Sequence, residues 1–92
     1  MKSLNHTQVK KFTDIPNVGS RIAHDFEVLG IKTPQDLTNQ DPVEMYVQIQ
    51  KITKSKHDPC VLDTYMAVVD FMNGAKARPW WHYTPIRKSL NL

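Results

Sequence analysis

The chain has little that would tie it together covalently or place it in a membrane. Its 92 residues include one cysteine, Cys60, which excludes an internal disulfide. The longest apolar run, residues 66–69, stops at Asp70, far short of the roughly 20 apolar residues that cross a bilayer. Residues 1–6 lack the apolar stretch of a secretory signal. We therefore expect a single cytoplasmic domain over residues 1–92, without a membrane partner.

Paired metal ligands and a recognisable catalytic group are also missing. No CxxC or HxxxH spacing connects the candidate metal ligands, which are His24, His57, Cys60 and His82. Cys60 lies in the first turn of an expected helix, whose dipole would lower the pKa of its thiol, and His57 precedes it closely. No Asn or Asp that would orient this pair is evident. We expect no metal, no cofactor and no catalysis, and keep a redox or drug-modifying enzyme built on Cys60 as a third hypothesis.

Positive charge is in modest excess but is unevenly distributed along the chain. Twelve Lys and Arg residues stand against nine Asp and Glu residues, for a net charge of +3. The basic residues fall into three groups: Lys2, Lys10 and Lys11, then Lys51, Lys54 and Lys56, and finally Lys76, Arg78, Arg87 and Lys88. A fold that brings these groups onto one face would attract a polyanion. The alternative is a solvated surface of mixed sign.

Proline after a short polar residue marks three expected helix starts. Thr33-Pro34, Asp41-Pro42 and Asp58-Pro59 each combine an N-cap oxygen with a residue whose φ already suits the first helical turn. Asp41 and Glu44 also have the spacing of a capping box. The apolar pattern predicts helices over residues 7–13, 20–29, 34–39, 42–55 and 59–72, then an irregular aromatic and basic segment over 74–92 in which a short helix restarts from Thr84 to Leu90.

The expected helix over residues 59–72 has the strongest apolar stripe and is the predicted spine of the core. The stripe consists of Leu62, Tyr65, Met66, Val69 and Met72. Asp63 and Asp70 lie opposite this stripe and are expected on the exposed face. No segment has the alternating pattern of a strand. The predicted fold class is therefore all-α, a small bundle of about five helices.

The most informative stretch is the bend over residues 15–19, with the sequence Ile-Pro-Asn-Val-Gly. Pro16 ends the preceding helix because its ring cannot continue it. Asn17 and Gly19 are the residue types that most readily accept a positive φ, and Val18 between them can point into a core. The bend therefore has the features of the hairpin in a helix-hairpin-helix unit.

The bend leads directly into a helix start, where unpaired backbone amides form a natural anion site. We expect the amides of Val18, Gly19 and Ser20 to bind a phosphate oxygen, with Asn17 in the turn. The Ser20 hydroxyl and the Arg21 guanidinium would add to this site. The alternative is a tight turn that only joins two packed helices.

Several short motifs occur together within residues 12–82. They are IPNVG at 15–19, Ala23, LGI at 29–31, Asp36-Leu37, Asp41-Pro42, Tyr46, DPCVLD at 58–63 and Trp80-Trp81. On these residues the chain resembles the bacterial helix-hairpin-helix family labelled pathogenicity locus, some of whose members are called mitomycin-resistance proteins. It is also similar to the C-terminal domain of TfoX-like competence regulators. The resemblance implies an all-helical fold and DNA binding, and it implies no known reaction.

Two further groups are candidates for nucleic-acid contacts. Lys51, Lys54 and Lys56 are a candidate second strand-contacting patch, and their alternative is a solubilising role. The helices on either side of this patch are a weak candidate for a second helix-hairpin-helix pair. For Trp80 and Trp81 we expect a packing role, with one ring closing the core and the other half exposed. Their alternative is stacking on unpaired bases, with Arg78 and Arg87 beside them.

Together these features predict a DNA-binding protein that does not read sequence. The expected ligand is double-stranded or branched DNA, held through residues 15–21 and neighbouring Lys and Arg side chains. The competing hypothesis is a protein-interaction module that uses exposed aromatic residues, for which Trp80, Tyr83 and Phe71 are the candidates.

Overall fold

The computed structural model describes residues 2–90 and confirms the all-α fold class. Within these residues it has four α-helices, four 3-10 helices and no strand. The α-helices are α1 (Ser20–Val28), α2 (Pro42–Thr53), α3 (Pro59–Met72) and α4 (Thr84–Ser89). The 3-10 helices are η1 (His6–Gln8), η2 (Phe12–Asp14), η3 (Pro34–Asn39) and η4 (Trp80–Tyr83).

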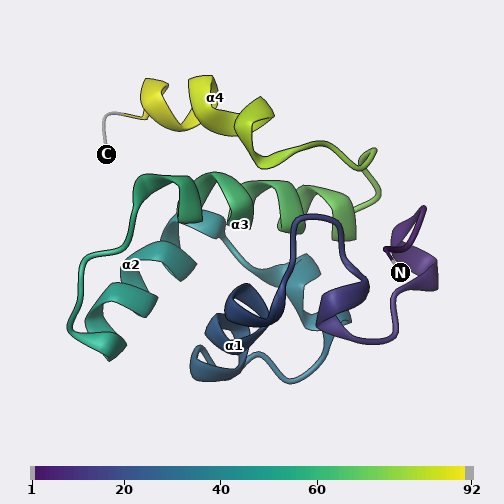
Figure 1. Ribbon diagram of the computed structural model, residues 1–92, viewed down its shortest axis with the longest axis horizontal. Coiled ribbons are helices and arrows are strands. Elements are labelled where there is room, and N and C mark those ends of the chain that lie inside the picture. Colours follow the sequence, from purple (N-terminus) through teal and green to yellow (C-terminus); the bar gives the residue numbers. More distant parts are fainter. Residues whose placement is uncertain (1, 91–92) are drawn as a thin grey trace.

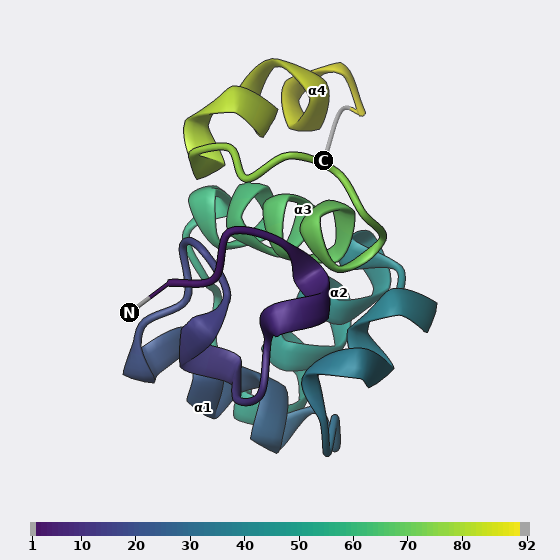
Figure 2. The ribbon, with the colours of Figure 1, turned by 90° about the vertical axis from the view of Figure 1, so that its right-hand side faces the viewer.

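Helix α3 runs through the middle of the molecule, as expected for the spine of the core. Figures 1 and 2 show α4 on one side of α3, and α1 and α2 on the other. Because neighbours cover it on both sides, ten of its 14 residues are buried. The predicted outward position of Asp63 is wrong, since its side chain is 0% exposed beneath α4. Asp70 is exposed as expected.

Polar contacts with α3 hold the C-terminal part of the described chain. Arg87 Nε donates to Asp63 Oδ1 at 2.9 Å, and Thr84 Oγ1 donates to Asp63 Oδ2 at 2.7 Å. The Tyr83 hydroxyl donates to Asp70 Oδ2 at 2.8 Å. The helix expected to restart at Thr84 is present as α4, and η4 occupies part of the segment that was expected to be irregular. Arg87 was expected to flank the Trp pair as a nucleic-acid contact. Its guanidinium instead forms an ion pair with the buried Asp63 carboxylate.

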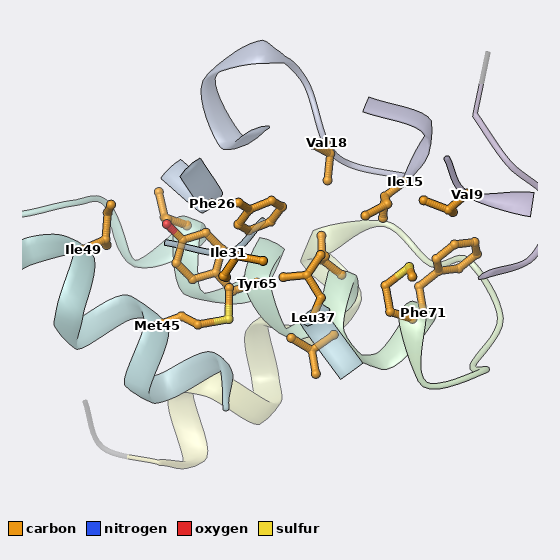
Figure 3. Packing of buried hydrophobic residues seen from close by; sticks show 14 residues of the cluster. Val9, Ile15, Val18, Phe26, Ile31, Leu37, Met45, Ile49, Tyr65 and Phe71 are labelled. Carbon is orange, nitrogen blue, oxygen red and sulfur yellow. The ribbon is translucent and has the colours of Figure 1, made fainter. Parts of the chain in front are cut away.

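The core collects aliphatic and aromatic side chains from most elements. Figure 3 shows Ile15 and Val18 pointing from the bend toward Phe26 and Leu37. Phe26 also packs against Tyr65, with ring centroids 5.8 Å apart. Both side chains of the bend are almost fully buried, with exposures of 0% for Ile15 and 1% for Val18. The bend is therefore anchored by burial, as the sequence predicted for Val18.

The helix predicted over residues 7–13 is wrong. Two single 3-10 turns, η1 and η2, replace it. Asp14 Oδ2 accepts the amides of Lys10 and Lys11 at 3.0 and 3.1 Å, so this side chain takes donors that a continuous helix would have used. Such short side-chain bonds compete with helix formation. The unit around the bend therefore consists of one 3-10 turn, the bend and α1, rather than two amphipathic helices.

Helix ends follow the local sequence closely. After α1, Gly30 has a φ of 80°, and the amides of Gly30 and Ile31 donate to the carbonyls of Glu27 and Phe26 at 3.0 and 2.9 Å. This is the predicted Schellman ending. Helix α2 stops two residues before the predicted end, because Lys54 takes a left-handed conformation with a φ of 54°.

The expected caps form in part. Asp41 Oδ1 accepts from the Val43 amide at 2.9 Å, and Asp58 Oδ1 accepts from the Cys60 amide at the same distance. The capping box predicted for Asp41 and Glu44 does not form, because Glu44 Oε1 accepts from Gln48 Nε2 instead.

Candidate nucleic-acid interface

The bend over residues 15–19 uses one left-handed residue. Asn17 has a φ of 73°, as its residue type allows. Gly19, which was expected to accept a positive φ as readily as Asn17, has φ −99° and ψ −173°, an extended conformation open to any residue. A Cβ added to Gly19 would meet nothing within 4 Å. Neither the backbone conformation nor internal packing therefore requires a glycine at this position.

The amides at the start of α1 face no partner within the described chain. Gly19 is the N-cap of α1 and has no side chain to cap it. Among residues 2–90, the amides of Gly19, Ser20, Arg21 and Ile22 donate no hydrogen bond to a protein acceptor. The predicted role of the Val18 amide is wrong, because it donates to the Ile15 carbonyl at 3.1 Å. The Ile22 amide, which the sequence interpretation missed, takes its place.

The remaining predicted groups at this site are accessible. Ser20 and Arg21 are exposed, and Arg21 carries the positive charge that a phosphate would meet. Asp25 on the same helix is drawn toward the core, because its Oδ2 accepts the Tyr65 hydroxyl at 2.8 Å. Burial, together with this bond, raises the pKa of Tyr65 well above its ordinary value, so the hydroxyl remains a donor. The start of α1 thus carries four unpaired amides, and its first two residues are the exposed Ser20 and Arg21.

The N-terminal segment supports the bend from behind. Lys2 Nζ donates to the Thr13 carbonyl at 2.8 Å and also to the Val18 carbonyl. The Ser3 amide donates to the Asp14 carbonyl at 2.7 Å. Burial lowers the pKa of Lys2, and the charge of Asp14 opposes this effect. No local pattern around Lys2 indicates this role, because its partners lie more than ten residues away in the chain.

A distant segment also reaches the bend. Asn17 Nδ2 donates to the Arg78 carbonyl at 2.7 Å, across 61 residues of sequence. Figure 2 shows the segment after α3 crossing between α3 and α4 toward the side of the molecule where the bend lies. Arg78 Nη1 lies 3.2 Å from His82 Nε2. A second arginine, which sequence reasoning did not place at the bend, is therefore its neighbour.

Lys51, Lys54 and Lys56 form a separate surface, here called the lysine patch. All three are exposed and line a shallow groove together with Tyr46 and His57. Figure 1 places the connection between α2 and α3 beyond the first turn of α3, whereas the bend crosses the other half of that helix. The lysine patch and the bend are therefore not one cluster.

The helix start next to the lysine patch has fewer unpaired amides than the start of α1: among its first residues in the described chain, only the Asp58 amide has no acceptor. Asp58 caps the Cys60 amide, and Pro59 has no amide hydrogen to offer. The predicted lowering of the Cys60 pKa is wrong: burial raises the pKa of the thiol, and its contact with the Asp58 carboxylate adds to this rise. The patch therefore offers mainly charge, and the raised pKa of Cys60 favours the thiol over the thiolate.

The tryptophan pair does not close the core. Trp81 is 61% exposed and Trp80 is half-buried, and their rings meet edge to face with centroids 5.5 Å apart. The buried aromatic residue of this segment is Tyr83 instead. Burial raises the pKa of Tyr83 to about 12, with a further contribution from the Asp70 carboxylate. Tyr83 and Phe71, proposed as exposed aromatic residues for a protein partner, are both buried.

Comparison with known proteins places these features in context. A family model described as pathogenicity locus matches residues 5–89. The mitomycin resistance protein McrB of Streptomyces lavendulae is 47% identical over 78 residues, which cover 85% of this chain and 74% of that protein. No solved structure matches the chain. In residues 2–90, no helix combines the length and the apolar character needed to span a bilayer.

Proposed function

We propose that this chain, which belongs to the pathogenicity locus family, is a cytoplasmic, non-enzymatic protein that binds the sugar–phosphate backbone of DNA without reading its sequence. Contact is made at the start of α1. The ligand is a duplex or branched DNA whose phosphate oxygen accepts hydrogen bonds from the backbone amides there.

The observation that carries this proposal is the group of unpaired amides from Gly19 to Ile22. The start of α1 is exposed, so its amides turn to solvent or to a ligand where a side-chain cap or another internal acceptor is missing. In the described chain this one has neither, although Asp41 and Asp58 cap the starts of α2 and α3. An uncapped start with four unpaired donors is suited to an external anion.

Gly19 gives independent support because its missing side chain serves no internal purpose. Its φ is ordinary and the space beside it is open. A bare N-cap lets a phosphate approach the backbone closely, whereas any larger residue would stand between the ligand and the amides. Arg21 then supplies a charge-assisted contact.

The lysine patch is proposed as an outer electrostatic contact. Each phosphate that it neutralises on a duplex adds about 0.9 to the slope of log affinity against log salt. Such contacts carry no sequence information. For the alternative, a protein-interaction module, Trp81 is an exposed aromatic residue, whereas Tyr83 and Phe71 are buried in the core.

The test is a fluorescence-anisotropy titration of a labelled blunt duplex at low and at raised salt. We expect binding that weakens as salt rises, and a loss of at least about tenfold in affinity for Arg21→Glu. Lys32→Glu is the matched control, because Lys32 is exposed just past the opposite end of α1 and undergoes the same reversal to a negative charge. Absence of binding at low salt, or equal losses in both variants, would contradict the proposal.

A further inference from the structure

Trp81 is an unusual surface residue. A tryptophan side chain with 61% exposure leaves a large apolar face in water. The edge of one ring meets the face of the other in the Trp80–Trp81 contact, at an interplanar angle of 85°. Trp80 is half-buried, so the exposed ring of Trp81 packs on a partly buried neighbour. The result is a supported aromatic surface that the fold itself does not cover.

This aromatic surface is linked to the bend through two hydrogen-bonding contacts. Asn17 holds the Arg78 carbonyl, and the Arg78 guanidinium lies 3.2 Å from the His82 ring nitrogen. Residues 78 and 82 bracket the tryptophan pair in sequence. The same short segment therefore touches the phosphate-binding bend and presents Trp81.

Charge around this segment is complementary to a nucleic acid. Lys76, Arg78 and Arg21 are exposed and basic. One exposed acidic residue, Asp70 of α3, also contacts this part of the chain, where its Oδ2 accepts the Tyr83 hydroxyl at 2.8 Å. A protein partner that used apolar contacts would need a wider aromatic surface, and Tyr83 lies in the core instead. An exposed ring beside basic groups is the arrangement used to bind single-stranded nucleic acid.

We propose that Trp81 stacks on an unpaired base next to the phosphate held at the bend, so that the preferred ligand is a duplex carrying a single-stranded extension. This inference rests on the proposed function. A base inside a duplex has both faces covered by its neighbours, whereas an unpaired base has a free face for the indole ring. Stacking of this kind tolerates any base, in keeping with a protein that does not read sequence.

The experiment compares two labelled DNA molecules by anisotropy: a blunt duplex, and the same duplex with a short single-stranded extension. The wild-type chain should bind the extended duplex about tenfold more tightly. Trp81→Ala should lose this gain and leave affinity for the blunt duplex unchanged. Trp81→Phe should keep most of the gain because it retains an aromatic face. Leu90→Ala, another exposed apolar side chain, is the matched control and should behave as wild type.

Two results distinguish this inference from the proposed function. If Arg21→Glu weakens binding of both DNA molecules while Trp81→Ala changes neither, stacking is overturned and the bend remains the phosphate site. If the chain binds neither DNA at low salt, both proposals are overturned. Quenching of indole fluorescence by the extended duplex and not by the blunt one, lost in Trp81→Phe, would place the base on this ring.

Discussion

The bend over residues 15–19 and the connection between α2 and α3 both lead into a helix, but they treat its start in opposite ways. The bend carries no charged side chain, and the first amides of α1 that follow it have no acceptor within residues 2–90. The connection carries Lys54 and Lys56, with Lys51 in the last turn of α2, and Asp58 caps the start of α3 ahead of Pro59. Two long-range hydrogen bonds also hold the bend. Lys2 Nζ donates to the Val18 carbonyl of the bend, and Asn17 Nδ2 of the bend donates to the Arg78 carbonyl.

This difference teaches that charge density and site geometry are separate properties in this chain. The lysine patch is the most basic short segment, yet its helix start is already capped. The bend contains no charged side chain, yet it leads into several fixed backbone donors at the start of α1. Fixed donors specify where a phosphate oxygen lies, whereas mobile lysines raise affinity without fixing a position. The account therefore predicts unequal effects of mutation at the two places.

The largest effect should come from the buried ion pair between α3 and α4, and it distinguishes the role of Arg87 from that of Arg21. Arg87→Ala leaves the fully buried Asp63 carboxylate without its counter-ion, which costs about 3 kcal/mol in the free energy of unfolding. Urea denaturation followed by circular dichroism measures this loss. Arg21→Ala, at the bend, should lower DNA affinity and leave the free energy of unfolding nearly unchanged.

Lys88→Ala is the matched control for Arg87→Ala, since Lys88 is the exposed neighbour on α4. Its free energy of unfolding should stay within about 0.5 kcal/mol of wild type. An Arg87→Ala variant as stable as Lys88→Ala would show that the buried carboxylate does not depend on its ion pair.

A smaller effect is expected at the closed helix start. Asp58→Ala removes the cap of α3 and should lower Tm by about 5 °C. DNA affinity should not fall, because the Asp58 carboxylate is not part of the proposed site. Differential scanning calorimetry and the anisotropy titration measure the two quantities. A loss of DNA affinity comparable to that of Arg21→Glu would remove the distinction between the start of α1 and the start of α3.

The stabilising contribution of Asp58 should depend on pH. The Cys60 amide bonds to the ionised carboxylate, which lowers the pKa of Asp58 in the folded state. Stability from this group is therefore present above the unfolded pKa and lost as pH falls through the folded pKa. The Tm difference between wild type and Asp58→Ala should shrink as pH falls below about 4, the ordinary pKa of an aspartate. Asp58→Asn, which keeps the capping oxygen without the charge, should lack this pH dependence.

The smallest effect is expected from single lysines of the patch. Lys54→Ala should weaken DNA binding only about threefold at low salt and lower the salt slope by about 0.9. The anisotropy titration over a range of salt concentrations measures both values. A loss as large as that of Arg21→Glu would mean that the patch, and not the bend, is the main contact.

Local sequence signals predicted those parts of the fold that depend on neighbouring residues. The caps at Asp41 and Asp58, the Schellman ending at Gly30 and the burial of Val18 were all predicted from short-range patterns. Each depends on a side chain and backbone groups a few residues away. The same local reasoning failed where Asp14 diverted amides from the expected first helix.

Contacts between distant segments could not be predicted in this way. Asp63 was expected in solvent because its own helix places it opposite the apolar stripe, and only the packing of α4 buries it against Arg87, 24 residues away. Arg78 reaches the bend across 61 residues, and nothing in either segment indicates the other. The candidate site was therefore located from the sequence, whereas its supporting residues were found only in the structure.

The central claim is that the amides at the start of α1 are reserved for an external phosphate, and Gly19→Asp tests it most directly. The new carboxylate would cap α1 as Asp58 caps α3, in space that is open and with an ordinary φ. The account predicts a Tm raised by about 3 °C together with a loss of at least about tenfold in DNA affinity. Gly19→Asp with a raised Tm and wild-type DNA affinity would contradict the account.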